Sequence, residues 1–375
     1  MKKIAAIVRA DCGGLGSLAR SFSDRLGFYR TVSLSRHPGE HYPHWYPRNR
    51  VAADGLTVEL LAWLCDGADV LLSFETWYGD LAPRVARRMG VRTALVPMYE
   101  CCPLARAGLE QTELAICPSR LDWYEMERTP GLAAARRVFL PIPFDVERIA
   151  FRRRRRARVF LHSMGHGGIG GRNGTQRVIE AWRHVKSNAR LVVRHQSPLP
   201  TDDLPRDERI TCLSGPAASG VENYWDLWSE GDVLLHPHRW DGLSLPIQEA
   251  LAAGMPVMTT RYWPFCDAGE ADEVAPEHRE GWLPPSSRRM AIDVTSTTRQ
   301  RICREITAHE TTPQAIAAAV DAWYDADISA ASDESREYAE HLSWRRLLPE
   351  YRRLFDGLCE AWAVGWGAAP RAPDA

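Results

Sequence analysis

Short apolar runs alternate with helix-like stretches along the first part of the chain. Runs of strand length occupy residues 4–8, 68–73, 91–96 and 114–117, and residues 81–89 carry apolar positions at helical spacing. Strands that alternate with helices at this spacing predict a parallel sheet that helices cover on both faces.

A second unit with the same alternation of strands and helices follows Pro141-Ile142-Pro143. Its strands are expected at residues 158–162, 190–194, 210–213, 232–236 and 256–260, and its helices at 175–184 and 246–253. We therefore predict an α/β protein of two doubly wound, Rossmann-like domains that face a cleft. Such a cleft is where this architecture binds its ligands.

The chain divides into four segments on this interpretation. Residues 1–150 form the N-terminal domain and residues 151–340 the C-terminal domain. Residues 341–364 are expected to form a helix that packs back toward the N-terminal domain, with a break at Pro349, and residues 365–375 a flexible tail.

The composition excludes several classes of protein. Lysine and arginine number 47 and aspartate and glutamate 48, so the net charge is −1, which rules out a polycation. No apolar run approaches the roughly 20 residues of a membrane span, and Arg9 and Asp11 end the first run too early for a signal peptide. Nine cysteines without a Cys-x-x-Cys pair argue against a zinc ribbon or a disulfide framework, so we expect a cytoplasmic protein.

The most informative segment lies where a buried strand, residues 232–236, leads through a polar loop into a helix. Pro246 suits the first turn of that helix and Gly254 its left-handed end. Backbone N–H groups around residues 244–248 and the helix dipole suit a diphosphate. Asp241 and Glu249 flank this turn, where they either accept hydrogen bonds from sugar hydroxyls or simply stabilise the dipole.

Residues 241–257 read DGLSLPIQEALAAGMPV. This segment resembles the nucleotide-sugar signature EGFGLPxxEAxAxGxPV of family-four glycosyltransferases with the GT-B fold, except that Asp241 stands where the family has glutamate. The resemblance implies that Glu249 binds the donor ribose and that the backbone of Gly242, Leu243, Ser244 and Leu245 meets the sugar and phosphates. It also implies transfer of a sugar from a nucleotide diphosphate sugar to a hydroxyl with retention, with no metal and no other cofactor.

Other segments resemble the same family in the same order. Gly14 belongs to the sequence Gly13-Gly14-Leu15-Gly16, which is similar to the first-domain loop that approaches the donor phosphates or the acceptor. Residues 143–148 resemble the bridge between the domains, and residues 342–344 with Tyr351 resemble the closing helix. The resemblance makes the N-terminal domain the acceptor side and the C-terminal domain the nucleotide-sugar side.

The glycine-rich loop at residues 165–175 departs from the family. The family places an arginine and a lysine-glycine pair there, whereas this chain has His166, Asn173 and Gly174. Arg172, which stands beside the expected place, is the substitute ligand for the diphosphate; the alternative is an exposed loop arginine.

Acceptor residues are expected after the strand that ends at Val96. The family often has a histidine there that faces the donor sugar, and this chain has Glu100 nearby. Glu100 is either a catalytic residue together with Asp241 and Arg172, or a polar loop residue whose hydrogen bonds are satisfied within the loop. Tyr99 and Trp77 are the expected acceptor contacts. The sequence segments at residues 75–78 and 98–100, together with Arg-Asn-Gly-Thr at 172–175, resemble those of glycosyltransferases from bacteriophages that infect GC-rich bacteria.

Six arginines between residues 152 and 158 leave two alternatives open. They form either a surface for a polyanion such as DNA or a solvated linker. Acceptors to consider are therefore DNA that carries 5-hydroxymethylcytosine, a virion protein and a cell-envelope glycan. A nucleotide-sugar epimerase and a non-catalytic nucleic-acid binder are rival functions. His236 and His238 have no acidic or cysteine partner at ligand spacing, so we expect no metal site.

Overall fold

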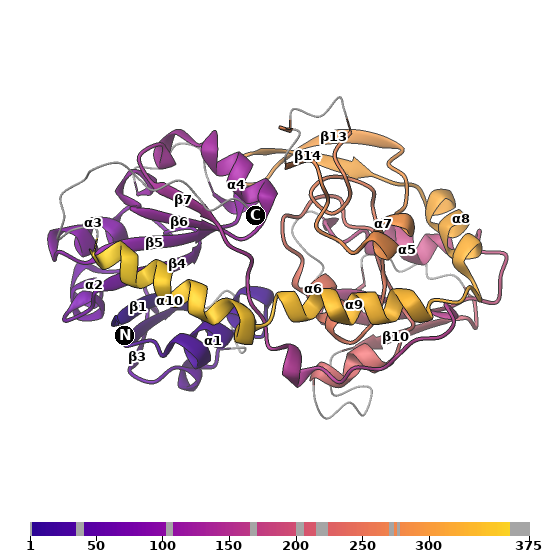
Figure 1. Cartoon of the computed structure of the whole chain (residues 1–375), viewed down its shortest axis with the longest axis horizontal. Helices are drawn as coiled ribbons and strands as arrows, with labels where there is room; N and C mark the ends of the chain where they lie inside the picture. The colour runs from indigo at the N-terminus through magenta and orange to yellow at the C-terminus, as the bar shows by residue number, and fades with distance from the viewer. Residues whose placement is uncertain are drawn as a thin grey trace.

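The computed structural model describes residues 2–34, 41–102, 108–165, 171–199, 206–214, 224–269, 274–275 and 278–360. Two α/β domains stand side by side along its longest axis, the N-terminal domain on the left of Figure 1 and the C-terminal domain on the right. This arrangement confirms the predicted fold class, because both domains are built on parallel sheets. No helix within the described residues is long and apolar enough to cross a membrane.

The N-terminal domain has a seven-stranded parallel sheet of order β3-β2-β1-β4-β5-β6-β7. Its strands are β1 (Ile4–Arg9), β2 (Arg30–Leu34), β3 (Asn49–Val51), β4 (Val70–Glu75), β5 (Arg92–Pro97), β6 (Leu114–Cys117) and β7 (Arg136–Phe139), and its helices are α1 (Gly14–Leu26), α2 (Val58–Cys65), α3 (Leu81–Arg88) and α4 (Arg120–Glu127). Every residue of β1, β4 and β5 is buried, which explains their nearly continuous apolar sequences. The strand order reverses direction between β1 and β4.

The C-terminal domain has a five-stranded parallel sheet of order β10-β9-β8-β11-β12. Its strands are β8 (Val159–Gly165), β9 (Arg190–His195), β10 (Ile210–Ser214), β11 (Val233–His236) and β12 (Val257–Thr259), and its helices are α5 (Thr175–Ala181), α6 (Leu245–Ala252), α7 (Pro285–Arg289), α8 (Pro313–Trp323) and α9 (Ser329–His341). Its strand order reverses between β8 and β11. A doubly wound domain binds ligands at such a reversal, outside the carboxyl ends of the strands.

The last described helix, α10 (Trp344–Glu360), returns to the N-terminal domain and lies along it in Figure 1. Trp344 and Tyr351 pack edge-on against Phe22 of α1, with ring centroids 4.9 and 5.2 Å apart. The break expected at Pro349 is wrong, because α10 continues through this residue. Proline cannot donate one of the backbone hydrogen bonds of the helix, and the packing of the aromatic side chains of α10 against the N-terminal domain compensates for this loss. Residues 361–375, including the predicted tail, lie outside the described residues.

A two-stranded antiparallel hairpin, β13 (Ser296–Arg301) and β14 (Glu305–Glu310), was not expected from the sequence. It spans the two domains at the top of Figure 1. Ile306 and Ala308 are buried in the core of the N-terminal domain, and Arg304 forms a 2.9 Å ion pair with Glu125 of α4. The chain therefore joins its domains through this hairpin as well as through α10.

Candidate functional site

A cavity of about 500 Å³ lies between the two domains. Strands β1 and β4 contribute their last residues, Arg9 and Glu75, and strands β8 and β11 contribute Gly165 and His236. The cavity thus lies where the reversal points of both sheets face each other. This is the position that the sequence predicts for a ligand.

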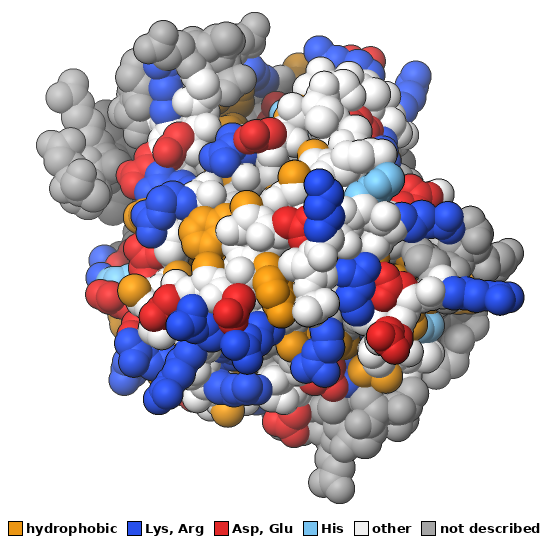
Figure 2. All heavy atoms as spheres, turned by 90° about the vertical axis from the view of Figure 1, so that its right-hand side faces the viewer, with side chains coloured by type: hydrophobic (Ala, Val, Ile, Leu, Met, Phe, Trp, Pro, Cys, Tyr) orange, Lys and Arg blue, Asp and Glu red, His pale blue; other side chains and the backbone are white. Residues whose placement is uncertain are grey.

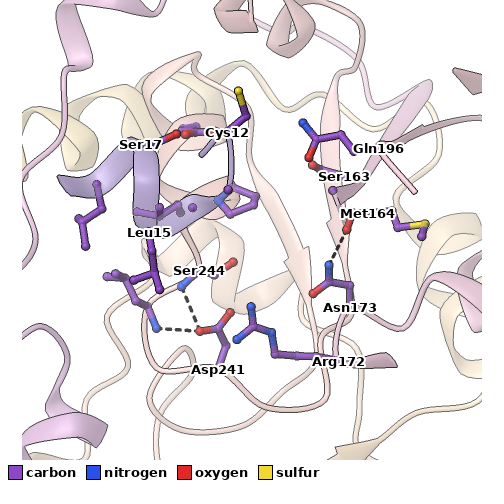
Figure 3. Close-up of a pocket in the computed structure, with 18 of the residues that line it drawn as sticks. Cys12, Leu15, Ser17, Ser163, Met164, Arg172, Asn173, Gln196, Asp241 and Ser244 are labelled. Carbon is purple, nitrogen blue, oxygen red and sulfur yellow. Dashed lines mark hydrogen bonds between the residues drawn. The ribbon is translucent and has the colours of Figure 1, made fainter. Parts of the chain in front are cut away.

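The turn before α6 is held by Asp241. Its Oδ1 atom accepts hydrogen bonds from the backbone N–H groups of Leu243, at 3.1 Å, and Ser244, at 3.2 Å (Figure 3). Ser244 caps the helix with a φ of 51°, a left-handed conformation that is uncommon outside glycine. Such strain is concentrated at functional sites, where the surrounding structure maintains it.

These bonds change the expected role of the helix terminus. The N–H groups of Leu243 and Ser244 already donate to Asp241, those of Ile247 and Gln248 donate to the Ser244 carbonyl, and Pro246 has none. Only the N–H of Leu245 remains available in this stretch. The expectation of several free N–H donors is therefore wrong, because the short Asp241 side chain caps its own turn.

Glu249 lies on the first turns of α6 and lines the cavity. It is 7% exposed, and its Oε2 atom accepts a 2.7 Å hydrogen bond from the hydroxyl of Tyr224. Burial raises the pKa of Glu249 to about 8, although the hydrogen bond from Tyr224 opposes that rise. Tyr224 also lines the cavity, so the two side chains together offer a polar edge to a ligand.

Arg172 and Glu100 form an ion pair across the cleft. Arg172 comes from the C-terminal domain and Glu100 from the N-terminal domain, and their Nη1 and Oε1 atoms are 3.0 Å apart. Burial raises the pKa of Glu100 to about 8, against the lowering effect of Arg172. For Arg172, burial works against the charge, but the carboxylates of Asp241 and Glu100 raise its pKa overall, so the guanidinium stays charged. The guanidinium is directed toward Asp241 in Figure 3, so all three predicted catalytic residues meet here.

Three buried polar atoms of cavity residues have no hydrogen-bond partner. They are Nε of Arg172, Nδ1 of His236 and Oγ of Ser244. An unsatisfied buried polar atom costs about 1–3 kcal/mol, and proteins rarely leave several together. Burial, followed by the charges of His238 and His162, lowers the pKa of His236 well below its ordinary value, so its imidazole is neutral. Each of these three side chains therefore lines the cavity while one of its polar atoms stays unsatisfied by the described residues.

The predicted glycines serve mainly to bring the domains together. Gly14 lines the cavity, and a Cβ atom on it would lie 3.3 Å from Cδ1 of Leu245 in the other domain. Gly242 does not line the cavity; a Cβ atom there would lie 2.9 Å from Oδ2 of Asp122. At both positions a larger residue would have to push a side chain of the other domain aside, so the two glycines let the turn before α6 come close to the N-terminal domain.

The loop before α5 places its remaining predicted residues differently. Asn173 lines the cavity and donates from Nδ2 to the Met164 carbonyl at 2.8 Å, so it shapes the loop. Gly174 does not line the cavity; its φ is 70°, and a Cβ atom would lie 2.6 Å from the Pro237 carbonyl oxygen. His166 lies outside the described residues.

The structure does not bring Trp77 and Tyr99 to the cavity. Trp77 is 1% exposed in the core of the N-terminal domain, where its indole N–H donates to Thr112 at 2.8 Å. Tyr99 is 6% exposed in the same core, and burial raises its pKa. Both side chains turn inward from the loops that carry them, so we withdraw them as acceptor contacts.

The arginine run at residues 152–158 is bound to its own domain. Arg153 pairs with Asp333, Arg158 pairs with Asp325, and the buried Arg154 donates to backbone carbonyls, including that of Trp228. None of its members lines the cavity. Across the outer end of the C-terminal domain, which faces the viewer in Figure 2, acidic side chains lie among the basic ones. The run is therefore held by contacts with its own domain, but every arginine in it except Arg154 is exposed. The polyanion surface and the solvated linker considered from the sequence both stay predictions.

Sequence reasoning missed several residues of the cavity. Arg9, Glu75, His195 and His236 are each the last residue of a strand, and Tyr224 begins the short 3-10 helix Tyr224–Ser229 before β11. The signal that would have found the first four is their position at carboxyl ends of strands near the reversal points.

No protein-family model matches this chain, and no curated protein matches it. HepE from Anabaena, solved with UDP and glucose, matches with a TM-score of 0.62 at 12% identity, over 95% of this chain and 100% of HepE. Sucrose-phosphate synthase from Thermosynechococcus elongatus has a TM-score of 0.59 at 15% identity, over 96% and 100% of the two chains. A glycosyltransferase from Rickettsia africae has a TM-score of 0.62 at 9% identity, over 95% and 98%. These likenesses show that the chain has the two-domain GT-B fold of glycosyltransferases.

Proposed function

We propose that this protein transfers a sugar from a nucleotide diphosphate sugar to an acceptor hydroxyl, with retention of configuration and without a metal. The observation that supports this most is the set of unpartnered buried atoms of Arg172, His236 and Ser244, which share one interdomain cavity with Asp241 and Glu249. The fold neighbour HepE, whose structures include UDP and UDP-glucose, supports the same class of donor.

The donor would lie with its ribose toward Glu249 and Tyr224 and its diphosphate toward Arg172. The diphosphate gains negative charge as the glycosidic bond breaks, and a charged arginine in a site closed to water stabilises that charge strongly. Arg172 would exchange its bond to Glu100 for bonds to the phosphate oxygens. Burial already raises the pKa of Glu100, and loss of Arg172 as its partner would raise it further. The protonated Glu100 would then face the sugar or acceptor hydroxyls without repelling the diphosphate.

Retention would follow from attack on the face that the diphosphate leaves. A phosphate oxygen then takes the proton of the acceptor hydroxyl as the new glycosidic bond forms, so no dedicated protein base is required. Asp241 holds the turn that positions Ser244 and places a second negative charge near Arg172. Closure of the two domains over the cleft would exclude water from the reaction.

The acceptor candidate that the bacteriophage-like sequences favour is a phage macromolecule such as DNA that carries 5-hydroxymethylcytosine. A virion protein and a cell-envelope glycan are the alternatives. All nine cysteines are free, which fits a reducing cytoplasm, that of the host if a phage encodes the protein.

A mass-spectrometric screen tests this function. UDP-, GDP-, ADP- and dTDP-sugars are each incubated with the protein and with simple glycans, proteins or hydroxymethylated DNA. We expect one donor to give a product heavier by one sugar residue, and proton NMR to show the anomeric configuration of the donor in that product. An epimerised donor without transfer would identify an epimerase, and no change in any donor would reject the proposal.

A further inference from the structure

Arg9 is a buried cation that has no anionic partner among the described residues. It is the last residue of β1, it is 7% exposed, and it lines the cavity. Within the described residues its guanidinium makes no hydrogen bond and no ion pair, and it lies over the ring of Tyr78, with 5.0 Å to the centroid. Buried arginines are almost always paired, because a desolvated charge without a partner is costly.

The surrounding backbone holds Arg9 in this position. Its carbonyl accepts a 2.7 Å hydrogen bond from the hydroxyl of Tyr46. Tyr78 and Glu75 both have left-handed backbone conformations, with φ of 55° and 68°, which non-glycine residues rarely adopt. The strained loop brings the Tyr78 ring under the guanidinium, so the structure maintains strain next to an unpaired charge.

The other charged side chains on the N-terminal side of the cavity are carboxylates. Asp11, Glu75 and Glu100 line the N-terminal side of the cavity, and each is at most 6% exposed. Carboxylates accept hydrogen bonds from sugar hydroxyls but repel an extended polyanion. The planar guanidinium of Arg9, in contrast, matches a single carboxylate or phosphate with two parallel hydrogen bonds.

We propose that Arg9 anchors the acceptor, and that this acceptor is a sugar with one anionic group, a carboxylate or a phosphate ester. The inference rests on the proposed function and adds the chemical class of its acceptor. The donor diphosphate already has its own unpartnered groups on the opposite wall, in Arg172, His236 and Ser244. An acidic sugar uses both features of the N-terminal wall, since its hydroxyls meet the carboxylates and its charge meets Arg9.

Calorimetry on the nucleotide-saturated protein tests the proposal with three probes: methyl glucoside, glucuronic acid and glucose 6-phosphate. The nucleotide is UDP if it binds; otherwise it is the one of GDP, ADP and dTDP that does. We expect one of the charged probes to bind at least tenfold more tightly than methyl glucoside. The Arg9→Met variant should lose that preference while its affinity for the nucleotide stays unchanged.

The alternatives give different results. Equal binding of neutral and charged probes, with nucleotide bound, would reject an anionic acceptor while leaving the proposed transferase intact. Weaker nucleotide binding by Arg9→Met would show that Arg9 serves the donor diphosphate, which also overturns the inference. Failure of every nucleotide to bind the wild-type protein would reject the proposed function itself.

Thermal unfolding separates a binding role from a structural one. Because Arg9 makes no hydrogen bond or ion pair with the described residues of the free protein, Arg9→Met should unfold at about the wild-type midpoint. Arg9→Lys should keep only part of the preference for charged probes. Arg50→Met is the matched control, since Arg50 also lies over an aromatic ring, that of Trp63, but is exposed and outside the cavity. A lower midpoint for Arg9→Met with the preference intact would make Arg9 a structural residue.

Discussion

The two sides of the cavity both lie at the reversal point of a parallel sheet, but their arginines differ in whether they have an anionic partner. On the C-terminal wall, Arg172 is paired with Glu100, and Glu249 accepts a hydrogen bond from Tyr224. On the N-terminal wall, Arg9 has only an aromatic ring beside it. Both arginines lie in the same cavity.

This difference separates two ways of preparing a site. A paired charge such as Arg172 is oriented before the ligand arrives and exchanges one anion for another, so little reorganisation is needed. An unpaired charge such as Arg9 is more costly in the free protein and gains its partner only from the ligand. The first suits the developing charge of a leaving group, and the second suits selection among acceptors.

The largest expected effect concerns the acid of the C-terminal wall. The pKa of Glu249 is about 8 in the folded protein, against about 4.3 for an unfolded glutamate. Its contribution to stability is therefore complete below pH 4 and is lost as the pH rises toward 8, by at most about 1.4 kcal/mol per pH unit. Urea midpoints from pH 4.5 to 9 should fall less steeply in Glu249→Gln than in the wild type. Glu337→Gln, an exposed control on α9, should show the same pH dependence of the urea midpoint as the wild type. If the midpoint of Glu249→Gln also changed with pH as in the wild type, the raised pKa of Glu249 would be contradicted.

Removal of the paired arginine should affect turnover next most strongly. Arg172→Ala should lower kcat about 10²- to 10³-fold, as loss of a group that stabilises transition-state charge usually does. The exposed Arg289→Ala in the same domain is the control and should retain the wild-type rate in a steady-state transfer assay. A wild-type kcat for Arg172→Ala would remove Arg172 from the leaving-group site.

Stability measurements sharpen the contrast between the two arginines. Arg172→Met leaves the buried Glu100 without its partner and should cost about 1–2 kcal/mol, a value discounted because the Arg172 side chain is 28% exposed. Arg9→Met breaks no pair and should change the free energy of unfolding by less than about 0.5 kcal/mol. If urea unfolding showed an equal loss of unfolding free energy in both variants, the pairing of Arg172 and the lack of a pair at Arg9 would not distinguish the two arginines.

A smaller effect than that of Arg172→Met is expected where the two domains touch. Gly242→Ala places a Cβ atom 2.9 Å from Oδ2 of Asp122, so the turn must shift, at a cost of about 1 kcal/mol. Gly357→Ala on α10 is the matched control; its Cβ atom meets nothing within 4 Å, so it should stabilise the protein by about 0.5–1 kcal/mol. Thermal unfolding of both variants checks the sign of each change.

Much of the fold and the centre of the site could be predicted from the sequence. Alternating apolar and helical stretches indicated both parallel sheets, and the segment around Glu249 placed two acids at one turn of one cavity. These features are local, because each depends on residues that are close in the sequence. The glycines at 14 and 242 were also found, although their close contacts with the opposite domain were not.

The remaining features depend on contacts between distant parts of the chain. The sequence of the arginine run does not reveal that Asp325 and Asp333 bind it. The inward direction of Trp77 depends on Thr112, 35 residues away. Arg9 could be recognised as unpaired only after the fold had shown which carboxylates lie out of its reach.

The most direct test of the central claim is a calorimetric titration of the four nucleotide diphosphates and their sugars into the wild-type protein and Glu249→Ala. We expect at least one nucleotide sugar to bind the wild type, and its affinity to fall about 10- to 100-fold in the variant, because the buried ribose hydroxyls lose their hydrogen-bond partner. Equal affinity in both proteins, or no binding to either, would contradict the assignment of this cavity to a sugar nucleotide.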